Sequence, residues 1–306
     1  MRIGVAIGFG LILAGAGGMF LSLSAKADAL PAAEAQAHGL ASSAPPPAVT
    51  PPPGSPVFRT FAEPVVESRC TRPLVLLYHG FDRGNSDMRT PSRTLEGQLA
   101  WLQENRIETI SMQEFLAWYD GTLKLPSRVA VLTVDDGEDT LYTRAWPVLK
   151  KYNARFVVGL PTANMERHPY GVVTWPQLAE MQASGLCEVV SHGHRHVALT
   201  ALPRATAAEE LGKSLSILAQ HDVRTAGAFF YPLGAVDPLS EQKVADAGFR
   251  GAFTAAGAPI AFGVTRRYHI PRVSMHRGTS RVSLEMFWGR RFWSVYAKNL
   301  KGCDAR

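Results

Sequence analysis

From Pro73 onward, short apolar runs alternate with longer segments whose apolar residues recur with helical spacing. This alternation is typical of repeated β-α units, because a strand buried on both faces is a continuous apolar run, whereas a covering helix has one apolar face. Such units pack as a parallel sheet covered by helices. The pattern therefore restricts the chain of 306 residues to the α/β class.

The expected elements follow from this pattern. The strands are expected over residues 74–78, 129–134, 156–160, 187–190, 226–231, 249–254 and 270–275. The helices are expected over residues 94–103, 112–119, 141–152, 175–184, 205–221 and 239–247, with Gly185 and Gly248 ending two of them. Roughly seven parallel strands fit a distorted β/α barrel that forms a single catalytic domain. A doubly wound open sheet is the alternative, although no Gly-x-Gly-x-x-Gly pattern indicates a dinucleotide site.

The first 27 residues have the composition of a secretory signal peptide. Arg2 supplies a positive end, residues 3–23 carry no charge, and small residues surround Ala27. We expect cleavage after Ala27 or, as a second choice, after Ala29. The alternative is an uncleaved membrane anchor through residues 3–23, which are about long enough to span a bilayer. In either case we expect the catalytic part to be exported, to the periplasm or the extracellular space.

Residues 28–57 are rich in Ala, Pro and Ser and contain few large apolar side chains. Such a segment cannot bury a core, so we expect an extended linker, followed by the folded domain in residues 58–306. Removal of residues 1–27 takes away two basic residues and no acid, so the formal net charge falls from +6 to +4 (6 − 2). This small basic excess, without a Lys/Arg run interleaved with aromatics, argues against a nucleic-acid partner.

The three cysteines, Cys70, Cys187 and Cys303, include no Cys-x-x-Cys pair, so a thiolate metal site is not expected. Cys187 lies in an apolar stretch and is interpreted as a small buried hydrophobe. In an oxidising compartment Cys70 and Cys303 could be bridged. Such a bridge is a hypothesis that would tie the two ends of the domain together.

Two adjacent carboxylates, Asp135 and Asp136, follow the apolar strand expected over residues 129–134. In barrels, the carboxyl ends of the strands carry the catalytic groups. A turn before Gly137 would explain one Asp but not two, because neighbouring carboxylates repel each other and one pKa rises. A metal ion separates their roles, since one Asp can bind it while the other acts as a base.

A second polar cluster, SHGHRH at residues 191–196, directly follows the strand expected over residues 187–190. His192 and His196 are four residues apart, so one helical turn would place both on one face, as a divalent metal requires. His192 and His194 would instead suit an extended strand. Two His and one carboxylate leave positions open for water and substrate, which is the pattern of a catalytic zinc site.

Together these residues resemble the polysaccharide deacetylase family, also called the NodB homology family or carbohydrate esterase family four, from about Pro73 to Arg277. TVDDG at residues 133–137 is similar to the family's Thr-Phe-Asp-Asp-Gly motif, and residues 191–196 are similar to its Ser-His-x-x-x-His motif. FFYPLG at residues 229–234 is similar to its third motif. Its Tyr-Pro-x-Gly form is typical of the branch that acts on poly-N-acetylglucosamine and related exopolysaccharides.

The resemblance implies a metal-dependent hydrolase that removes N-acetyl groups from an extracellular or cell-envelope polysaccharide. Asp136, His192 and His196 would bind zinc, or another divalent ion such as cobalt or nickel. Asp135 would be the base that activates metal-bound water, and the backbone N–H of Tyr231 would help to stabilise the oxyanion. We expect a monomer whose partner is the N-acetylated polysaccharide.

Two parts of the family pattern are not in their usual places. The Arg that often accompanies the third motif is replaced by Phe, and Arg272 is the candidate to supply its charge from a later strand. The acid that protonates the leaving amine is open, with His276, His79 and His194 as candidates in that order.

Two other functions also remain open. A barrel glycoside hydrolase uses carboxyls that reach the sugar from separate places about 5 to 9 Å apart, which the neighbours Asp135 and Asp136 do not suggest. A non-catalytic glycan-binding barrel could keep surface aromatics such as Trp288 and Trp293 without a full metal site. We interpret these two Trp as packing residues of a closing C-terminal helix.

Overall fold

A computed structural model describes residues 58–303, apart from residues 85, 168–170, 280 and 290. The expected signal peptide and linker, residues 1–57, lie outside the described residues. Within the described part of the chain, no helix combines the length and the apolar character needed to cross a membrane.

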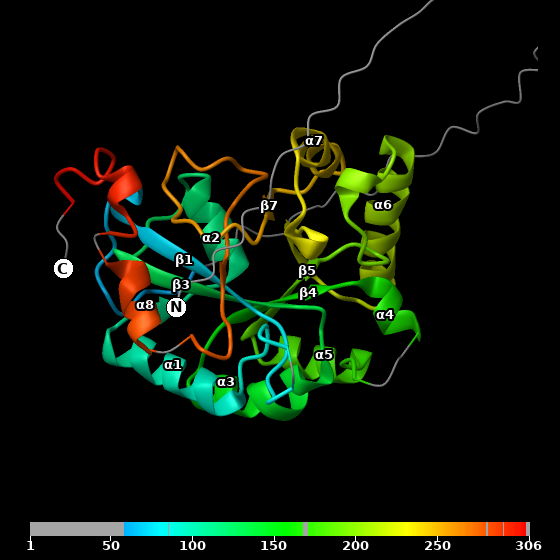
Figure 1. Cartoon of the computed structure of the whole chain (residues 1–306), viewed down its shortest axis with the longest axis horizontal. Helices are drawn as coiled ribbons and strands as arrows, with labels where there is room; N and C mark the ends of the chain where they lie inside the picture. The colour runs from blue at the N-terminus through cyan, green and yellow to red at the C-terminus, as the bar shows by residue number, and fades with distance from the viewer. Residues whose placement is uncertain (1–57, 85, 168–170, 280, 290, 304–306) are drawn as a thin grey trace, which may run out of the picture. The chain divides into compact units, whose positions relative to one another are not determined.

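The centre of the molecule is a parallel sheet with helices on its outside (Figure 1). The strand order is β7-β6-β5-β4-β3-β1-β8, and the short β2 shares one side of β3 with β4. Because these strand pairs are all parallel, the strands end at the same side of the sheet. The strands are β1 (Arg72–Tyr78), β2 (Glu108–Thr109), β3 (Arg128–Asp135), β4 (Phe156–Leu160), β5 (Cys187–Ser191), β6 (Thr225–Phe230), β7 (Gly251–Phe253) and β8 (Val273–Ser274).

The sheet curls until one segment links its two edges. Ile270 pairs with Phe253 of β7, and three residues later Val273 pairs with β1. Between them, Pro271 has no N–H to donate, and Arg272 buries its side chain to 1% exposure, so the segment is not one regular strand. The distorted β/α barrel is therefore confirmed, whereas the last expected strand is reduced to the two residues of β8.

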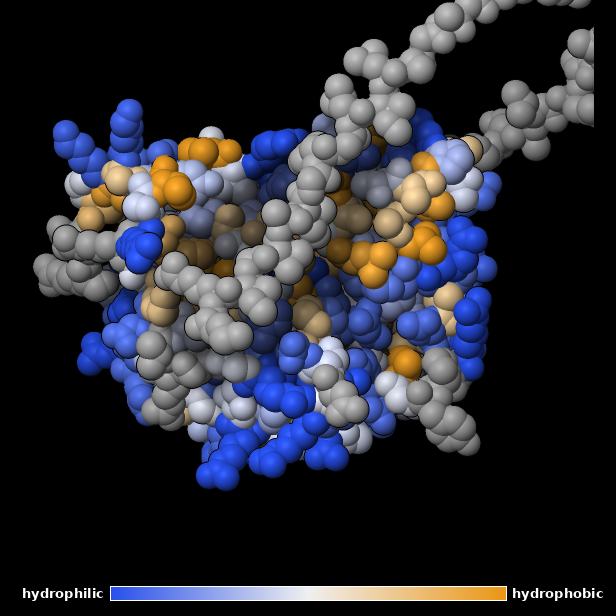
Figure 2. All heavy atoms as spheres, viewed as in Figure 1, coloured by the Kyte–Doolittle hydropathy of each residue, from blue (hydrophilic) through white to orange (hydrophobic). Residues whose placement is uncertain are grey.

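The helices cover the sheet from both sides. In Figure 1, α1, α3 and α5 lie along one side of the strands, and α2 and α7 lie along the other. Figure 2 shows hydrophilic side chains on the outer surface of α1 and α3, and apolar side chains gathered beneath α7. The helices are α1 (Ser92–Glu104), α2 (Met112–Tyr119), α3 (Trp146–Lys151), α4 (Thr162–Arg167), α5 (Trp175–Ala183), α6 (Arg204–Gln220), α7 (Pro238–Asp246) and α8 (Arg281–Trp288).

The six expected helices are present, with ends shifted by one or two residues. The helix expected over residues 141–152 begins as a π-helical turn, Leu141–Ala145, before α3. Pro147 is tolerated because it stands in the first turn of α3, where no N–H is needed. Gly185 and Gly248 follow α5 and α7 with φ of 76° and 82°, as expected of left-handed caps. The six residues of α4 were not expected, because one turn and a half shows no clear periodicity.

The C-terminal end of the described chain packs against the first helix and strand. Trp288 at the end of α8 lies 5.9 Å, ring to ring, from Trp101 of α1, and its Nε1 donates to the carbonyl of Arg72. Trp293 lies beyond α8 and is 2% exposed. The interpretation of both Trp residues as packing residues is therefore confirmed.

Cys70 and Cys303 form a disulfide across 233 residues of sequence, with their Cα atoms 5.3 Å apart. The hypothesis that they tie the ends of the domain together is confirmed. Arg69 strengthens this contact by donating to the carbonyls of Asn299 and Lys301. Cys187 is a free, buried cysteine, as expected.

Candidate active site

The two polar clusters lie at the carboxyl ends of β3 and β5, on either side of β4. Asp135 is the last residue of β3, and His192 directly follows β5. Gly159 of β4 lies between them and pairs with Asp135. A Cβ on Gly159 would lie 2.6 Å from the Phe230 ring and 3.2 Å from Asp135 Oδ1. The absence of a side chain at this position therefore leaves room for the carboxylate.

Asp135 is buried and held by both nitrogens of one guanidinium. Arg272 Nη1 donates to Oδ1 and Arg272 Nη2 donates to Oδ2, each at 2.7 Å. Burial alone would raise the pKa of Asp135, but the charge of Arg272, with smaller effects from His192 and His79, lowers that pKa to about 2. Asp135 is therefore an ionised, oriented carboxylate at neutral pH, and the structure brings Arg272 to the carboxylate for which the sequence proposed it.

Next to this pair, Asp136, His192 and His196 bring three potential ligand atoms within 4.8 Å of one another. The two Nε2 atoms are 3.2 Å apart, and Asp136 Oδ1 lies 3.3 Å from His196 Nε2 and 3.7 Å from His192 Nε2. Ligands about 2.0–2.1 Å from a tetrahedral zinc are separated by about 3.3 Å, so the spacing fits such an ion. These three residues could hold a divalent cation.

His192 has the protonation state that a metal ligand needs. Its Nδ1 lies 2.8 Å from the carbonyl oxygen of Phe230. A carbonyl can only accept, so Nδ1 donates and Nε2 keeps its lone pair toward the cluster. Burial lowers the pKa of His192, against the opposing effect of Asp135 and Asp136, and so favours the neutral ring.

A loop, and not the helical turn that the spacing predicted, brings His192 and His196 together. Residues 192–196 are not helical, and Gly193 and His196 have φ of 78° and 57°. Asp136 is also left-handed, with φ of 69°. Residues other than Gly rarely adopt this conformation, and they keep it only where their surroundings enforce it.

The polysaccharide deacetylase family model matches residues 122–252, which contain the Asp pair and the His loop. The poly-beta-1,6-N-acetyl-D-glucosamine N-deacetylase of Staphylococcus aureus is 25% identical over 189 residues, or 58% of this chain and 64% of that protein. Over these residues the chain is similar to the polysaccharide deacetylase family. It spans just under two thirds of the length of that curated relative.

Solved structures of other proteins share the fold of this chain. IcaB from Ammonifex degensii is similar with a TM-score of 0.63 and 25% identity, covering 71% of this chain and 97% of that one. The Streptococcus pyogenes deacetylase PplD, solved in complex with acetate, is similar with a TM-score of 0.66 over 71% of this chain and 97% of that one. At 20% identity, the likeness to PplD shows the fold alone.

One residue expected in the candidate site is already engaged elsewhere. The backbone N–H of Tyr231 donates to the carbonyl of Phe253 at 3.0 Å, as part of the pairing between β6 and β7. The Tyr231 side chain is buried, and its hydroxyl donates to the carbonyl of Tyr268. The prediction that the Tyr231 N–H stabilises an oxyanion is therefore wrong, because that N–H has an acceptor within the sheet.

The three histidines considered as proton donors occupy different places. His276 is exposed and is not among the described residues that bond or pair with the Asp135–His192 centre. His194 points away from the centre, with Nδ1 3.0 Å from Thr162 Oγ1. His79, which directly follows β1, is half-buried and close enough to lower the pKa of Asp135. Its Nδ1 is buried without a hydrogen-bond partner among the described residues.

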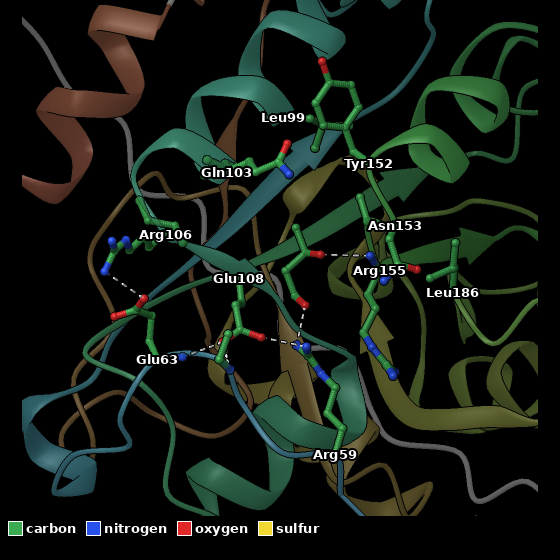
Figure 3. Close-up of a pocket in the computed structure, with 15 residues that line it drawn as sticks. Arg59, Glu63, Leu99, Gln103, Arg106, Glu108, Tyr152, Asn153, Arg155 and Leu186 are labelled. Carbon is green, nitrogen blue, oxygen red and sulfur yellow. Dashed lines mark hydrogen bonds and ion pairs between the residues drawn. The ribbon is translucent and has the colours of Figure 1, made fainter.

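A cavity of about 550 Å³ lies away from this centre, at the amino ends of the strands (Figure 3). Arg59 in its wall binds Glu108 at 2.7 Å, and Arg106 lies 3.7 Å from Glu63. Because these charges pair with one another, and because the cavity holds none of the grouped His and Asp ligands, the candidate active site is the opposite, carboxyl end of the sheet.

Proposed function

We propose that the chain is an exported, metal-dependent hydrolase that removes N-acetyl groups from a polysaccharide of the poly-N-acetylglucosamine type. The observation that carries this proposal is the meeting of a metal-ligand triad, Asp136, His192 and His196, with the ionised and buried Asp135. The printed activity of the Staphylococcus aureus relative supports the substrate class. The disulfide between Cys70 and Cys303 supports an oxidising compartment outside the cytoplasm.

Asp136, His192 and His196 would hold the cation. A bound zinc, cobalt or nickel ion would polarise the acetamide carbonyl and make water more acidic. The residues themselves contribute orientation, since the hydrogen bond from His192 Nδ1 to Phe230 fixes the ring and directs Nε2 to the cluster.

Asp135 is the proposed base. Its Oδ2 lies 3.6 Å from His192 Nε2, so a water molecule held beside the triad is within reach of the carboxylate. Arg272 keeps Asp135 ionised. Its two hydrogen bonds fix the orientation of the carboxylate, and with it the direction of the lone pairs that remain to accept a proton. The low pKa keeps the carboxylate in its acceptor form at neutral pH.

His79 replaces His276 as the proposed proton donor to the leaving amine. Its position after β1 places it at the same end of the sheet as Asp135, and its buried, unpartnered Nδ1 leaves one ring nitrogen without a fixed role. A donor must reach the leaving nitrogen directly or through one water molecule. His276 follows β8 at the same end of the sheet, but it is exposed, and unlike His79 it has no effect on the pKa of Asp135 among those that contribute to it.

Leu233 replaces Tyr231 as the proposed source of an oxyanion-stabilising N–H. Pro232 has no N–H, so the N–H of Leu233 is the next one along the loop. Leu233 is left-handed, with φ of 60° and ψ of 8°, and its side chain is 74% exposed. A strained, exposed residue beside the His192 loop suits a backbone donor aimed at substrate.

Release of acetate from defined glycans tests this function. The full chain, incubated with β-1,6-linked N-acetylglucosamine oligomers, is expected to release acetate, to lose this activity when metal is chelated, and to regain it with zinc, cobalt or nickel. O-acetylated glycans and peptidoglycan in parallel assays define the substrate class. Acetate release that persists after thorough metal removal would overturn the proposal, and binding without any release would favour the glycan-binding alternative.

The matched control is Asp135→Asn, which removes the base without removing a ligand of the triad. Its turnover is expected to fall by about 100- to 10,000-fold while its zinc content stays near that of the wild type. His79→Ala and His276→Ala separate the two proton-donor assignments, because only the donor loses turnover and keeps its metal.

A further inference from the structure

The loop that carries His192 and His196 is held from two sides by residues outside the proposed metal site. From one side, α6 presents Glu210 and Ser214, which are one helical turn apart and fully buried. From the other side, the start of α4 presents its backbone N–H groups. Ser214 contacts Ser191, directly before His192, and the other contacts are to the residues between the two histidines.

Glu210 makes the densest set of these contacts. Its Oε1 accepts from the backbone N–H groups of His194, at 2.9 Å, and Arg195. Its Oε2 accepts from Arg195 Nε at 2.9 Å. The side chain is 1% exposed, so these donors, and not water, neutralise its charge. Gly193 fits closely against it, since a Cβ there would lie 3.3 Å from Oε1.

Ser214 and α4 hold the rest of the loop. Ser214 Oγ lies 2.8 Å from Ser191 Oγ, which also accepts from the Gly193 N–H at 3.2 Å. On the α4 side, the Thr162 N–H donates to the carbonyl of Gly193 at 3.2 Å, and the Ala163 N–H donates to that of His194 at 2.8 Å. His194 is thus an anchor of the loop, which explains a third histidine that does not face the centre.

We propose that Glu210 is a positioning residue, which holds the 192–196 loop in the conformation that brings His192 and His196 together before metal binds. The inference rests on the proposed metal site. His196 has a left-handed backbone, which persists only where neighbouring bonds enforce it, and the two N–H groups held by Glu210 come from the residues directly before it. Without the carboxylate, the N–H groups of His194 and Arg195 lose these hydrogen bonds. Metal binding then has to order His196, and the free energy of this ordering lowers the metal affinity.

The first test compares the zinc affinity of two neighbouring variants by competition with a chromophoric chelator. Glu210→Gln keeps the side-chain length but turns one acceptor into a donor that faces N–H groups. Its zinc dissociation constant is expected to rise by about 10- to 100-fold, as for other residues that orient ligands from behind. Glu209→Gln, on the exposed side of the same helix, is the control and is expected to match the wild type. Equal affinities of the two variants would overturn the inference.

The second test needs no metal. In the apo protein, the backbone amides of His194 and Arg195 are expected to exchange with solvent about tenfold faster in Glu210→Gln than in Glu209→Gln, as for the loss of one charged hydrogen bond. Equal amide exchange rates in the two variants would contradict the proposal that Glu210 holds these backbone N–H groups. If Glu210→Gln does not fold, Glu210→Asp, which shortens the side chain and draws the carboxylate away from these amides, replaces it in both tests, again with Glu209→Gln as control.

The two proposals fail in different ways. A wild-type chain that binds no zinc overturns the proposed function and this inference with it. Zinc binding that is unaffected by Glu210→Gln, or by Glu210→Asp in its place, overturns this inference alone and leaves the proposed function standing.

Discussion

Asp135 and Arg272 form a buried ion pair in the candidate active site. The guanidinium meets both carboxylate oxygens at 2.7 Å, and both side chains are buried. Removing either partner leaves a buried charge without compensation, which typically costs about 3 to 5 kcal/mol. The pair therefore contributes to stability as well as to the proposed chemistry.

This pair gives the stability of the protein a defined pH dependence. The pKa of Asp135 is about 2 in the folded state, against 3.8 ordinarily, so folding favours the ionised form. The resulting stabilisation of about 2 kcal/mol is complete above pH 4 and is lost as the pH falls toward 2. In urea-unfolding experiments, the difference in unfolding free energy between wild type and Asp135→Asn is expected to shrink by this amount from pH 4 to pH 2. A difference that stays constant over this range contradicts the assignment.

The residues of the centre differ in how well the sequence predicts them. Asp135, Asp136, His192 and His196 could be proposed because they belong to two short contiguous motifs at the ends of apolar strands. The hydrogen bond of the Tyr231 N–H could not be predicted from the sequence, because it depends on pairing with β7, about twenty residues further along. The roles of all these residues in catalysis stay predictions until the variants are measured.

At the scale of elements, β4 leaves room for the Asp135 carboxylate because Gly159 has no side chain. Gly159 has an ordinary φ, so Ala is allowed by the backbone, but the added methyl would press on Phe230 and Asp135. Gly159→Ala is expected to lower the free energy of unfolding by about 1 to 3 kcal/mol, as overpacking typically does, and to lower turnover by displacing the carboxylate. Gly278→Ala is the control, because its Cβ would meet open space. Thermal unfolding and acetate release are the measurements, and equal effects of the two changes would argue against close packing at β4.

Helices and strands could be predicted where their pattern is long, and could not where it is interrupted. The expected helix over residues 205–221 agrees with α6 to one residue, because its buried positions recur regularly. The 192–196 loop was expected to be a helical turn, because nothing in the sequence marks His196 as left-handed. Its conformation comes from Glu210 and α4, which are contacts that a local pattern does not contain.

At the scale of the whole molecule, the disulfide between Cys70 and Cys303 joins the two ends of the described domain. By restricting the unfolded chain, a bridge of this span contributes about 2 to 5 kcal/mol. The variant with both Cys70→Ser and Cys303→Ser is expected to unfold at correspondingly lower urea concentration than the wild type. Reductant should destabilise the wild type and leave the double variant unchanged. A wild type that is indifferent to reductant would falsify this account.

The segment that links β7 to β1 also sets the order in which the molecule can be completed. Arg272 lies 137 residues after Asp135 and comes after the end of β7, so a chain emerging from the ribosome contains Asp135 and the sheet up to β7 before it contains the guanidinium. Until then, an enclosed Asp135 must stay protonated or hydrated, and the barrel has an open seam. Docking of one short segment closes the seam and supplies the counter-charge of Asp135 in the same event. A nascent or truncated chain therefore has neither a finished fold nor a working centre.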